Sequence, residues 1–252
     1  MLTGMYTAVS AMLDLQTSQT VITNNMANVN TTGFKAEKVI YKTFDDVLVQ
    51  NNDNHVNGKG TNQQLGILNP GVKIDEIKTN YEQGNIIETG NKTDFSINGK
   101  GFFTVRDEEG NIFYTRNGAF NVNQQGYLVT SSGAQVLNSN NEPIYIGASN
   151  ITVDNNNNLI LSSGVVHRFN IVDFDNYDSL EKVGENLYTG QGARATNEYK
   201  VQNMAKESSN VDIIQSTADL MANLRAFEAN QKVVQVMDSI LGKMASEIGT
   251  VR

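Results

Sequence analysis

The chain has 252 residues, enough for one large or two small domains, and 39% of them are apolar. A net charge of −8 without a basic stripe argues against nucleic acid and anionic membrane surfaces as partners. The absence of cysteine excludes disulfides and thiolate metal sites. No run approaches 18 apolar residues, so we expect no membrane insertion. The first residues lack the pattern of a cleaved secretory signal, so any export is expected to leave the N-terminus uncut.

Residues 2–28 show the first helical pattern. Their apolar and polar stripe repeats in steps of four and three, and the proposed interface positions on it are Leu2, Met5, Val9, Met12, Gln16, Gln19 and Met26. This rhythm predicts a helix with a coiled-coil seam that turns polar in its second half. The polar seam residues are expected to weaken self-association and to fix its register. Asparagines at 24, 25, 28 and 30 are expected to end the helix and to bond backbone groups there.

The other end of the chain repeats the pattern. Residues 211–248 contain no proline, and their stripe supplies the interface positions Leu220, Leu224, Phe227, Gln231, Val234 and Leu241. Ser208, Ser209 and Asn210 precede this helix as capping side chains. Neither terminal helix has a helical neighbour in sequence. We therefore expect the two to meet in one coiled-coil-like unit that packs against further copies of the chain.

Between the helices, apolar residues alternate with polar ones and turn residues recur at short intervals. The pattern predicts strands at residues 71–74, 95–97, 102–105, 111–115, 126–129, 159–161 and 167–172. Residues 51–70 lack a clear period and are predicted to be a flexible loop. The expected fold is α+β, with a terminal helical domain (1–34 plus 208–252), an extended connector or loop region (35–80) and a mainly antiparallel outer β domain (81–207).

Several short motifs occur in order along the chain: the NNxANxNTxGFK pattern that starts at Asn24, the strand–turn–strand from Asp94, the hairpin YTRNGAF, and the segments SSNVD and RAFEANQK. Together they resemble the axial family of flagellar basal-body rod and hook proteins. The matching positions are Asn24, Asn25, Ala27, Asn28, Asn30, Thr31, Gly33, Phe34, Lys35, Gly99, Gly101, Phe102, Phe103, Tyr114, Thr115, Arg116, Gly118, Asn210, Val211, Arg225 and Glu228. One departure is that the family more often carries an acidic residue where this chain has Asn98 or Lys100.

The resemblance implies a non-enzymatic structural subunit of the basal-body rod. It implies export through the flagellar export apparatus, assembly in the periplasm or cell wall, and helical polymerisation with copies of itself and with neighbouring rod and hook subunits. Chain length and the segment 43–50 look closer to rod proteins than to the longer hook protein, and the distal rod is the preferred position. The alternative is a β-rich surface module for glycans or adhesion, with helical stalk ends. Removal of residues 1–30 and 208–252 separates the two hypotheses, because only assembly depends on the helices.

Other candidate sites give weaker signals. Residues 154–158 (DNNNN) resemble the start of a calcium loop, but the glycine and the twelfth-position glutamate that such a loop requires are absent, so a β-turn is expected. The acidic run 107–109 before Gly110 is interpreted as a solvated hairpin tip. His55 and His167 are far apart in the sequence and have no ligand cluster beside them. We therefore predict no catalytic residue, no metal site and no cofactor.

Overall fold

The computed structural model describes residues 2–51, 55–56, 59–60, 63–147, 151–154, 156–184, 186–196 and 198–250. They divide into two compact units. The helical unit comprises Met1–Met26, Glu37–Lys78 and Ile213–Arg252, and the β unit comprises Ala27–Ala36 and Thr79–Asp212. No helix among the described residues is long and apolar enough to cross a membrane. The domain boundaries predicted at 34, 80 and 207 stay a prediction.

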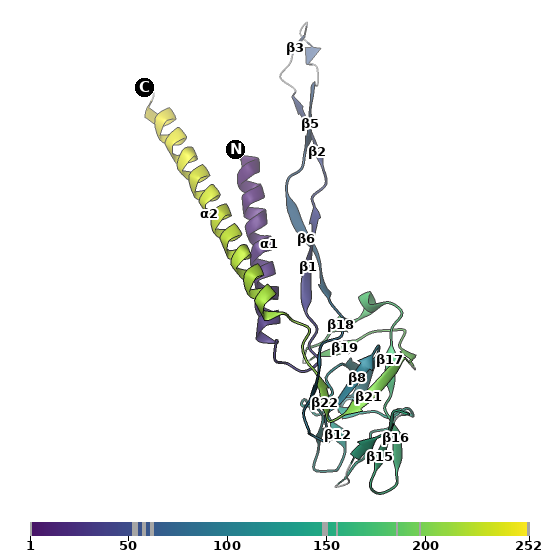
Figure 1. Cartoon of the computed structure of the whole chain (residues 1–252). Helices are drawn as coiled ribbons and strands as arrows, with labels where there is room; N and C mark the ends of the chain where they lie inside the picture. The colour runs from purple at the N-terminus through teal and green to yellow at the C-terminus, as the bar shows by residue number, and fades with distance from the viewer. Residues whose placement is uncertain are drawn as a thin grey trace. The chain divides into compact units, whose positions relative to one another are not determined.

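The helical unit contains the two long helices that the sequence predicts. Helix α1 is Leu2–Ala27 and helix α2 is Ile213–Thr250, so both expected helices are confirmed within two residues at each end. They contact each other, since a Cβ added at Gly4 would lie 3.0 Å from Cε of Met237. The helices run antiparallel, and α2 continues past the N-terminal end of α1 (Figure 1).

A long β-hairpin completes the helical unit. Strand β1 (Glu37–Thr43) pairs with β6 (Val72–Thr79), and β2 (Val47–Asn51) pairs antiparallel with β5 (Gln63–Leu68). Short strands β3 (His55–Val56) and β4 (Lys59–Gly60) follow toward the tip. The middle of the hairpin contacts α1, because the Ser10 hydroxyl donates to the Val72 carbonyl at 3.0 Å.

The hairpin corrects the prediction of an irregular loop at 51–70. Residues 63–68 form a strand whose partners include Val47 opposite Leu68 and Leu48 opposite Ile67. Gly66 and a register shift between Val49 and Gln50 interrupt the alternation of apolar and polar residues. The period-two signal is therefore lost in the sequence although the pairing is regular on both sides of the shift. The remaining residues of this segment, 52–54, 57–58 and 61–62, lie outside the described ranges.

The β unit is built from antiparallel strands. Its largest sheet among the described residues has the order β11–β12–β13–β9–β10–β19–β18, with β17 also pairing with β9 and β20. These strands are β9 (Phe102–Arg106), β10 (Ile112–Thr115), β11 (Asn121–Val122), β12 (Leu128–Val129), β13 (Gln135–Val136), β17 (Ile171–Asp173), β18 (Glu181–Lys182), β19 (Leu187–Thr189) and β20 (Arg194–Ala195). A short 3-10 helix, Tyr177–Ser179, precedes β18.

Smaller sheets surround this one. Strand β14 (Ile151–Val153) pairs with β15 (Asn158–Leu161), which pairs with β16 (Val166–Arg168). Strand β21 (Tyr199–Asn203) pairs with β8 (Phe95–Gly99), and β22 (Ala205–Glu207) pairs with β7 (Ile86–Glu88). Each predicted strand is confirmed in position, except that 167–172 is divided between β16 and β17.

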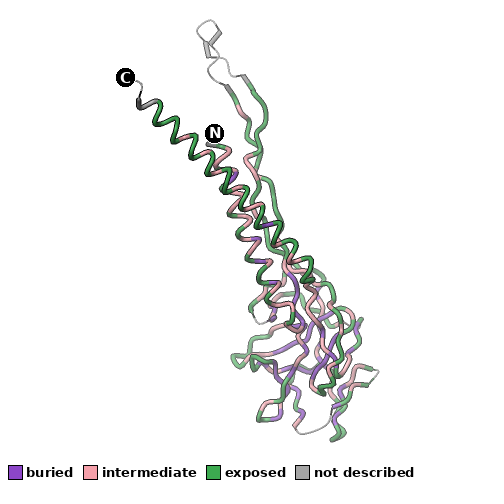
Figure 2. Tube along the Cα trace, turned by 60° about the vertical axis from the view of Figure 1, so that its left-hand side comes forward, coloured by how far each residue is buried: buried purple, intermediate pink, exposed green. Residues whose placement is uncertain are grey.

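The apolar core lies in the β unit. Phe95, Phe103, Phe120 and Phe169 pack with their ring centroids 5.0–6.5 Å apart, largely edge to face. A second cluster places Phe102 on the other side of β9, against Phe174 and Tyr188. Buried residues are dense in the β unit and sparse along the helices (Figure 2). The helical unit therefore leaves much of its apolar surface uncovered within one chain.

Candidate assembly interface

The segment that follows α1 is part of the β unit and turns sharply. After Ala27 the Asn28 carbonyl accepts a hydrogen bond from the Thr31 backbone N–H at 3.1 Å, and the Asn28 side chain accepts one from the Thr31 hydroxyl at 3.1 Å. Gly33 follows in the left-handed region, with φ of +68°. The expected end of the helix at the asparagine cluster is confirmed.

Asn25 plays a different part from the one predicted. It lies inside α1, and its side chain donates to the Glu37 carbonyl at 2.7 Å and accepts from the Glu37 backbone N–H at 2.9 Å. The amide therefore pairs with the backbone at the start of β1 as a neighbouring strand would. Asn24 and Asn30 are exposed.

Gly33 lies directly against the hairpin that carries Arg116. A Cβ added at Gly33 would lie 2.6 Å from the Arg116 carbonyl carbon and 2.6 Å from the Asn117 nitrogen. The Gly33 N–H donates to the Glu207 carbonyl at 2.8 Å. Nearby, the Asn186 side chain donates to the Thr32 carbonyl at 3.1 Å. This segment is thus fixed to the β unit by backbone approaches that leave no room for a side chain.

A buried ionic cluster lies beside this contact. Lys35 Nζ contacts Glu207 Oε1 at 2.5 Å, and Arg116 Nη1 contacts Glu207 Oε2 at 3.3 Å. Side-chain exposure is 0% for Lys35, 5% for Arg116 and 1% for Glu207. Glu207 Oε1 also accepts the Gly84 backbone N–H at 3.0 Å. One carboxylate therefore satisfies two cations and a backbone donor from separate parts of the chain.

The two cations make further contacts that fix their positions. Lys35 Nζ donates to the Glu82 carbonyl at 2.7 Å, and Arg116 Nη2 donates to the Gly99 carbonyl at 2.9 Å. The Arg116 guanidinium also lies 5.3 Å from the centroid of the Phe102 ring. Burial lowers the pKa of Lys35, and the Glu207 carboxylate opposes that shift.

Asn210 ties the start of the C-terminal segment to the same place. Its side chain accepts the Ala36 backbone N–H at 2.7 Å and donates to the Asn80 carbonyl at 2.8 Å and the Glu82 carbonyl at 3.0 Å. We call Gly33, Lys35, Arg116, Glu207 and Asn210 the motif junction. It joins the segment that follows α1 to the segment that precedes α2.

The motif junction accounts for many of the motif positions named from the sequence. Phe34 is buried under Lys182, whose Nζ lies 4.3 Å from the ring centroid, and Thr115 donates its hydroxyl to the Asn186 carbonyl at 2.9 Å. Gly118 leaves no room for a side chain, since an added Cβ would lie 1.7 Å from the Phe95 carbonyl oxygen. Arg225 and Glu228 are exposed on α2, away from the junction in sequence.

Sequence reasoning missed Glu207, the anion at the centre of the junction. It lies one residue before the SSNVD segment and on no apolar stripe. The available signal was the presence of Lys35 and Arg116 inside otherwise apolar or turn-forming motifs, because two buried cations require a carboxylate. Nothing in the spacing indicates which of the chain's acidic residues supplies it.

The residues of α1 that are covered within the chain lie one position before those of the predicted stripe, and we call them the covered line of α1. Gly4, Ala11, Ser18 and Asn25 recur every seven residues and are buried or half-buried, and Ala8 on the same side is buried. Of the predicted stripe, Met5, Met12, Gln19 and Met26 are half-buried at the margin of this line, whereas Val9 and Gln16 are exposed. Leu2 begins the helix, but its side chain lies outside the described set.

On α2 the covered line forms a regular heptad. Leu220, Phe227, Val234 and Leu241 are half-buried at every seventh position, and between them the positions Ser216, Asn223, Asn230 and Met237 complete the seam. Leu224 and Gln231, which the sequence placed on the same stripe, are exposed. A seam with two asparagines is weak but specifies register. The role of these positions between copies stays a proposal.

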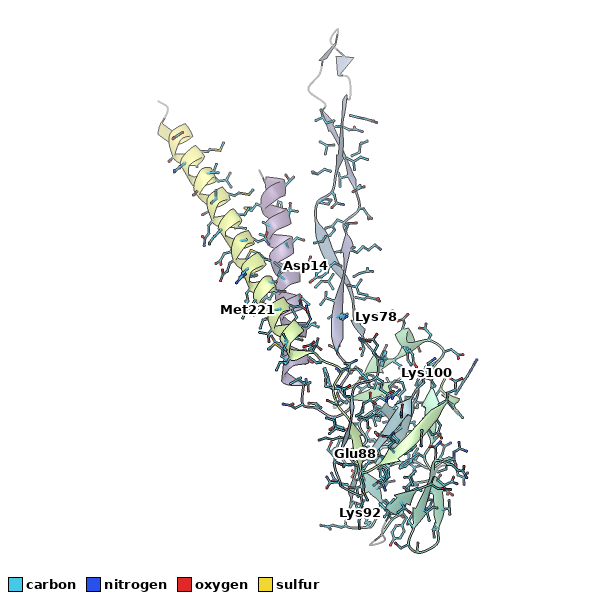
Figure 3. The ribbon with its side chains drawn as sticks, in the orientation of Figure 1. Asp14, Lys78, Glu88, Lys92, Lys100 and Met221 are labelled. Atoms are coloured by element: carbon cyan, nitrogen blue, oxygen red, sulfur yellow. The ribbon has the colours of Figure 1, made fainter. Side chains whose placement is uncertain are left out.

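Large apolar side chains are exposed on both helices. On α1, Tyr6 is 69% exposed and Leu13 is 61% exposed, and Val9 lies with them. We call these three residues the outer face of α1. On α2 the exposed apolar residues are Ile213, Ile214, Met221, Leu224, Val233, Val236, Ile240 and Met244. Asp14 on α1 and Met221 on α2 are labelled in Figure 3.

The acidic run 107–109 and the segment 154–158, considered above as possible sites, both form turns. The Asp107 backbone carbonyl accepts the Gly110 N–H at 3.0 Å at the tip of the β9–β10 hairpin. The Asp154 backbone carbonyl accepts the Asn157 N–H at 2.9 Å between β14 and β15. Both turn predictions are confirmed. In the described part of the chain no group of three or more His, Asp or Glu residues is placed to hold a metal ion.

Comparison with known proteins places these features in a family. Residues 5–35 match the model described as flagella basal body rod protein. Residues 96–168 match the flagellar hook protein FlgE/F/G D1 domain, and residues 202–247 match the flagellar basal body rod FlgEFG protein C-terminal model. The matched ranges contain Lys35, Arg116 and Glu207 of the motif junction.

Full-length relatives agree with these matches. The chain is 32% identical to the flagellar basal-body rod protein FlgG of Bacillus subtilis, over 98% of this chain and 99% of the relative. It is 31% identical to FlgG of Buchnera aphidicola from Schizaphis graminum, over 91% and 94%. It is 29% identical to the flagellar hook-basal body complex protein FlhO of Bacillus subtilis, over the whole of both chains.

The fold and these matches define a structural protein of the bacterial flagellum, in which terminal helices flank an antiparallel β body. Within that class the chain belongs to the flagellar basal-body rod family and is a structural subunit of the rod. Membership implies that it assembles with other rod and hook subunits and serves motility.

Proposed function

We propose that the subunit polymerises helically with copies of itself through the exposed apolar faces of α1 and α2. It is exported through the flagellar export apparatus without cleavage of its N-terminus, and it takes its place in the part of the rod that crosses the periplasm or cell wall. The distal rod is the expected position. Its work is mechanical, and it catalyses no reaction and needs no cofactor.

The observation that carries this proposal is the distribution of apolar side chains on the helices. Ser18, Asn25 and Asn223 are buried on the covered lines, while Tyr6, Leu13 and Ile214 remain 60–80% exposed. Oδ1 of Asn223 and Oδ2 of Asp14 are buried without a hydrogen-bond partner. Burial of polar groups and exposure of large apolar ones is unfavourable for a chain that stays alone. The exposed faces gain their burial from neighbouring copies.

Charge placed on the exposed faces is expected to block assembly. In the source bacterium with its own copy of the gene deleted, Leu13→Glu combined with Met221→Glu should abolish motility and leave basal bodies without a complete rod, as seen by electron microscopy. Each buried unpaired carboxylate raises the critical concentration for polymerisation by about tenfold or more. The purified variant should keep the near-ultraviolet circular dichroism of the wild type, because the β unit is untouched.

The matched control is Val165→Glu combined with Val166→Glu. Val165 is 47% exposed and Val166 on β16 is 55% exposed, so the change adds the same two charges at exposed apolar positions outside the helices. It should leave motility intact. Normal motility of the Leu13→Glu/Met221→Glu variant would refute assembly through these faces.

Domain removal requires cuts that respect the motif junction. Deletion of 1–30 and 208–252 would remove Asn210 and part of the 27–36 segment, both of which belong to the β unit. Deletion of 2–26 and 213–250 keeps the junction. We expect the shortened protein to lose assembly while its β unit stays folded.

The exposed glutamines of the helices give a further prediction. Gln16 and Gln231 are both exposed, so Gln16→Leu with Gln231→Leu enlarges the apolar faces of the free subunit. We expect aggregation of the purified monomer at lower concentration, measured by light scattering. Gln124→Leu with Gln125→Leu, two exposed positions in the β unit, is the control that adds the same number of leucines elsewhere. Equal behaviour of the two variants would show that the helical glutamines have no role in keeping the monomer dispersed.

A further inference from the structure

The covered seam of α2 is longer than the helix that covers it. Gly4, near the start of α1, contacts Met237, and α2 continues to Thr250. Thirteen residues of α2 therefore extend past this contact, which at 1.5 Å per residue is about 20 Å. We call residues 238–250 the α2 overhang. Figures 1 and 2 both show this part of α2 beyond the N-terminal end of α1.

The overhang keeps the apolar pattern of the seam. Leu241 stands seven residues after Val234, and Met244 stands seven residues after Met237. Ile240 and Met244 are each 41% exposed. The seam that α1 covers thus continues past the end of α1 as an apolar surface, on which Leu241 is half-buried and Ile240 and Met244 are exposed. This continuation can take up a further helix.

The outer face of α1 offers a surface of matching length. Tyr6, Val9 and Leu13 span eight residues, about 10 Å of helix, and the exposed positions that follow on the same side, Gln16 and Thr20, are polar. The apolar part of the overhang, from Ile240 to Met244 and on toward Ile248 in sequence, has a similar length. Both surfaces are apolar and both belong to the same end of the helix pair.

We propose that the α2 overhang of one copy packs on the outer face of α1 of a second copy. This inference rests on the proposed function and names the partner surfaces within it. Met244 lies seven residues beyond the level of the Gly4–Met237 contact, and Val9 lies five residues on its other side. Bringing Met244 beside Val9 therefore shifts the two copies along the helix axis by twelve residues, or about 18 Å.

The contact joins two different surfaces, so it does not close on itself. Each copy presents its own outer α1 face to one neighbour and its own overhang to another. Such heterologous contacts build an open helical filament rather than a closed dimer. Each α1 then lies between two α2 helices, one from its own chain on the covered face and one from a neighbour on the outer face.

Disulfide cross-linking tests the pairing directly, because the wild-type chain contains no cysteine. A mixture of Val9→Cys and Met244→Cys subunits, polymerised and oxidised, should give a covalent heterodimer on a non-reducing gel. A disulfide needs Cα atoms within about 7 Å, so the product reports direct contact. Its yield should exceed that of a Gln16→Cys and Met244→Cys mixture by about tenfold, because Gln16 lies about 10 Å further along α1.

Two readouts separate failure of this inference from failure of the proposed function. The double variant Gly4→Cys/Met237→Cys, treated with a short bismaleimide reagent, should be cross-linked within one chain whether or not the protein polymerises, because the two positions face each other in the helix pair. If filaments form and this internal cross-link forms, but Val9 and Met244 do not cross-link, the pairing is wrong while the proposed function stands. Homodimers of Val9→Cys alone or Met244→Cys alone would also overturn it, since they indicate a two-fold contact. Wild-type protein that forms no polymer would overturn the proposed function itself.

Deletion of residues 239–250 provides a second test that needs no oxidation. The shortened α2 still covers α1 up to the Gly4 contact, so the helix pair should keep its helical circular dichroism apart from the lost turns. The critical concentration for filament formation should rise by at least about tenfold. Unchanged polymerisation would contradict the proposal.

Discussion

Glu207→Gln is expected to destabilise the β unit by about 3–5 kcal/mol, the cost of breaking a buried ion pair by removal of one partner. Glutamine keeps the size of the side chain but removes the negative charge that Lys35 and Arg116 share. Both cations are almost fully buried and have no access to water to replace it. The folded state then holds buried positive charge that is not balanced, whereas water solvates both cations in the unfolded chain.

Urea unfolding of the full-length monomer measures this effect. The chain has no tryptophan, and apart from Tyr6 and Tyr41 its tyrosines lie in the β unit. Tyrosine circular dichroism in the near ultraviolet therefore reports on that unit. Glu198→Gln, which neutralises an exposed carboxylate in the same unit, is the control and should change stability by less than about 0.5 kcal/mol. A Glu207→Gln effect as small as that of the control would contradict the role assigned to the junction.

A double-mutant cycle isolates the interaction from other effects of the substitution. Lys35→Met alone should also destabilise, because Glu207 loses its closest partner. The combination of Lys35→Met with Glu207→Gln should cost less than the sum of the two, by about 0.5–3 kcal/mol, since the second change removes a charge that the first left unpaired. Assembly should fail in the single variants although no residue of either helix is changed, because the junction anchors the segments adjoining both helices.

The elements that could be predicted from the sequence are those whose signal is local. Twenty-six residues of α1 and thirty-eight of α2 carry a sustained helical period, so both helices were located closely. The strands around Phe95, Phe102 and Ile112 are short runs rich in aromatic and β-branched residues, bounded by Asn–Gly and Glu–Gly turns, so they too were found. Strand β5 was missed because a glycine and a shifted register break its alternation.

Features that depend on distant parts of the chain could not be predicted in the same way. Lys35 and Glu207 are 172 positions apart, and no local pattern links them. The covered line of α1 differs from the predicted stripe because small residues, Gly4, Ala8 and Ala11, are the ones covered. A stripe chosen by apolarity favours Met5, Val9 and Met12 instead. The sequence shows which face of α1 is apolar. Which face contacts the rest of the chain depends on how closely the helices can pack, and small residues allow the closest approach.

Gly33→Ala is the second substitution for which we expect a large loss, about 3 kcal/mol or more, since two separate costs add. The residue has φ of +68°, and an L-residue with a Cβ pays about 1–2 kcal/mol in the left-handed region. The new Cβ would also lie 2.6 Å from two backbone atoms at Arg116 and Asn117, which directly follow the paired strand β10 and cannot move freely. Urea unfolding followed by tyrosine circular dichroism measures the sum.

Gly110→Ala separates the two costs. Gly110 has φ of +89° at an exposed hairpin tip, and an added Cβ there meets nothing within 4 Å. Its loss should therefore be the conformational cost alone, about 1–2 kcal/mol. Gly33→Asn provides the converse, because asparagine tolerates the left-handed region but still carries a Cβ. It should remain nearly as destabilised as Gly33→Ala. If Gly33→Asn instead recovered wild-type stability, glycine would be needed only for the turn. If Gly33→Asn stays destabilised, glycine is needed because no side chain fits against the backbone at Arg116. The end of α1 at the asparagine cluster then serves to place this glycine in that contact.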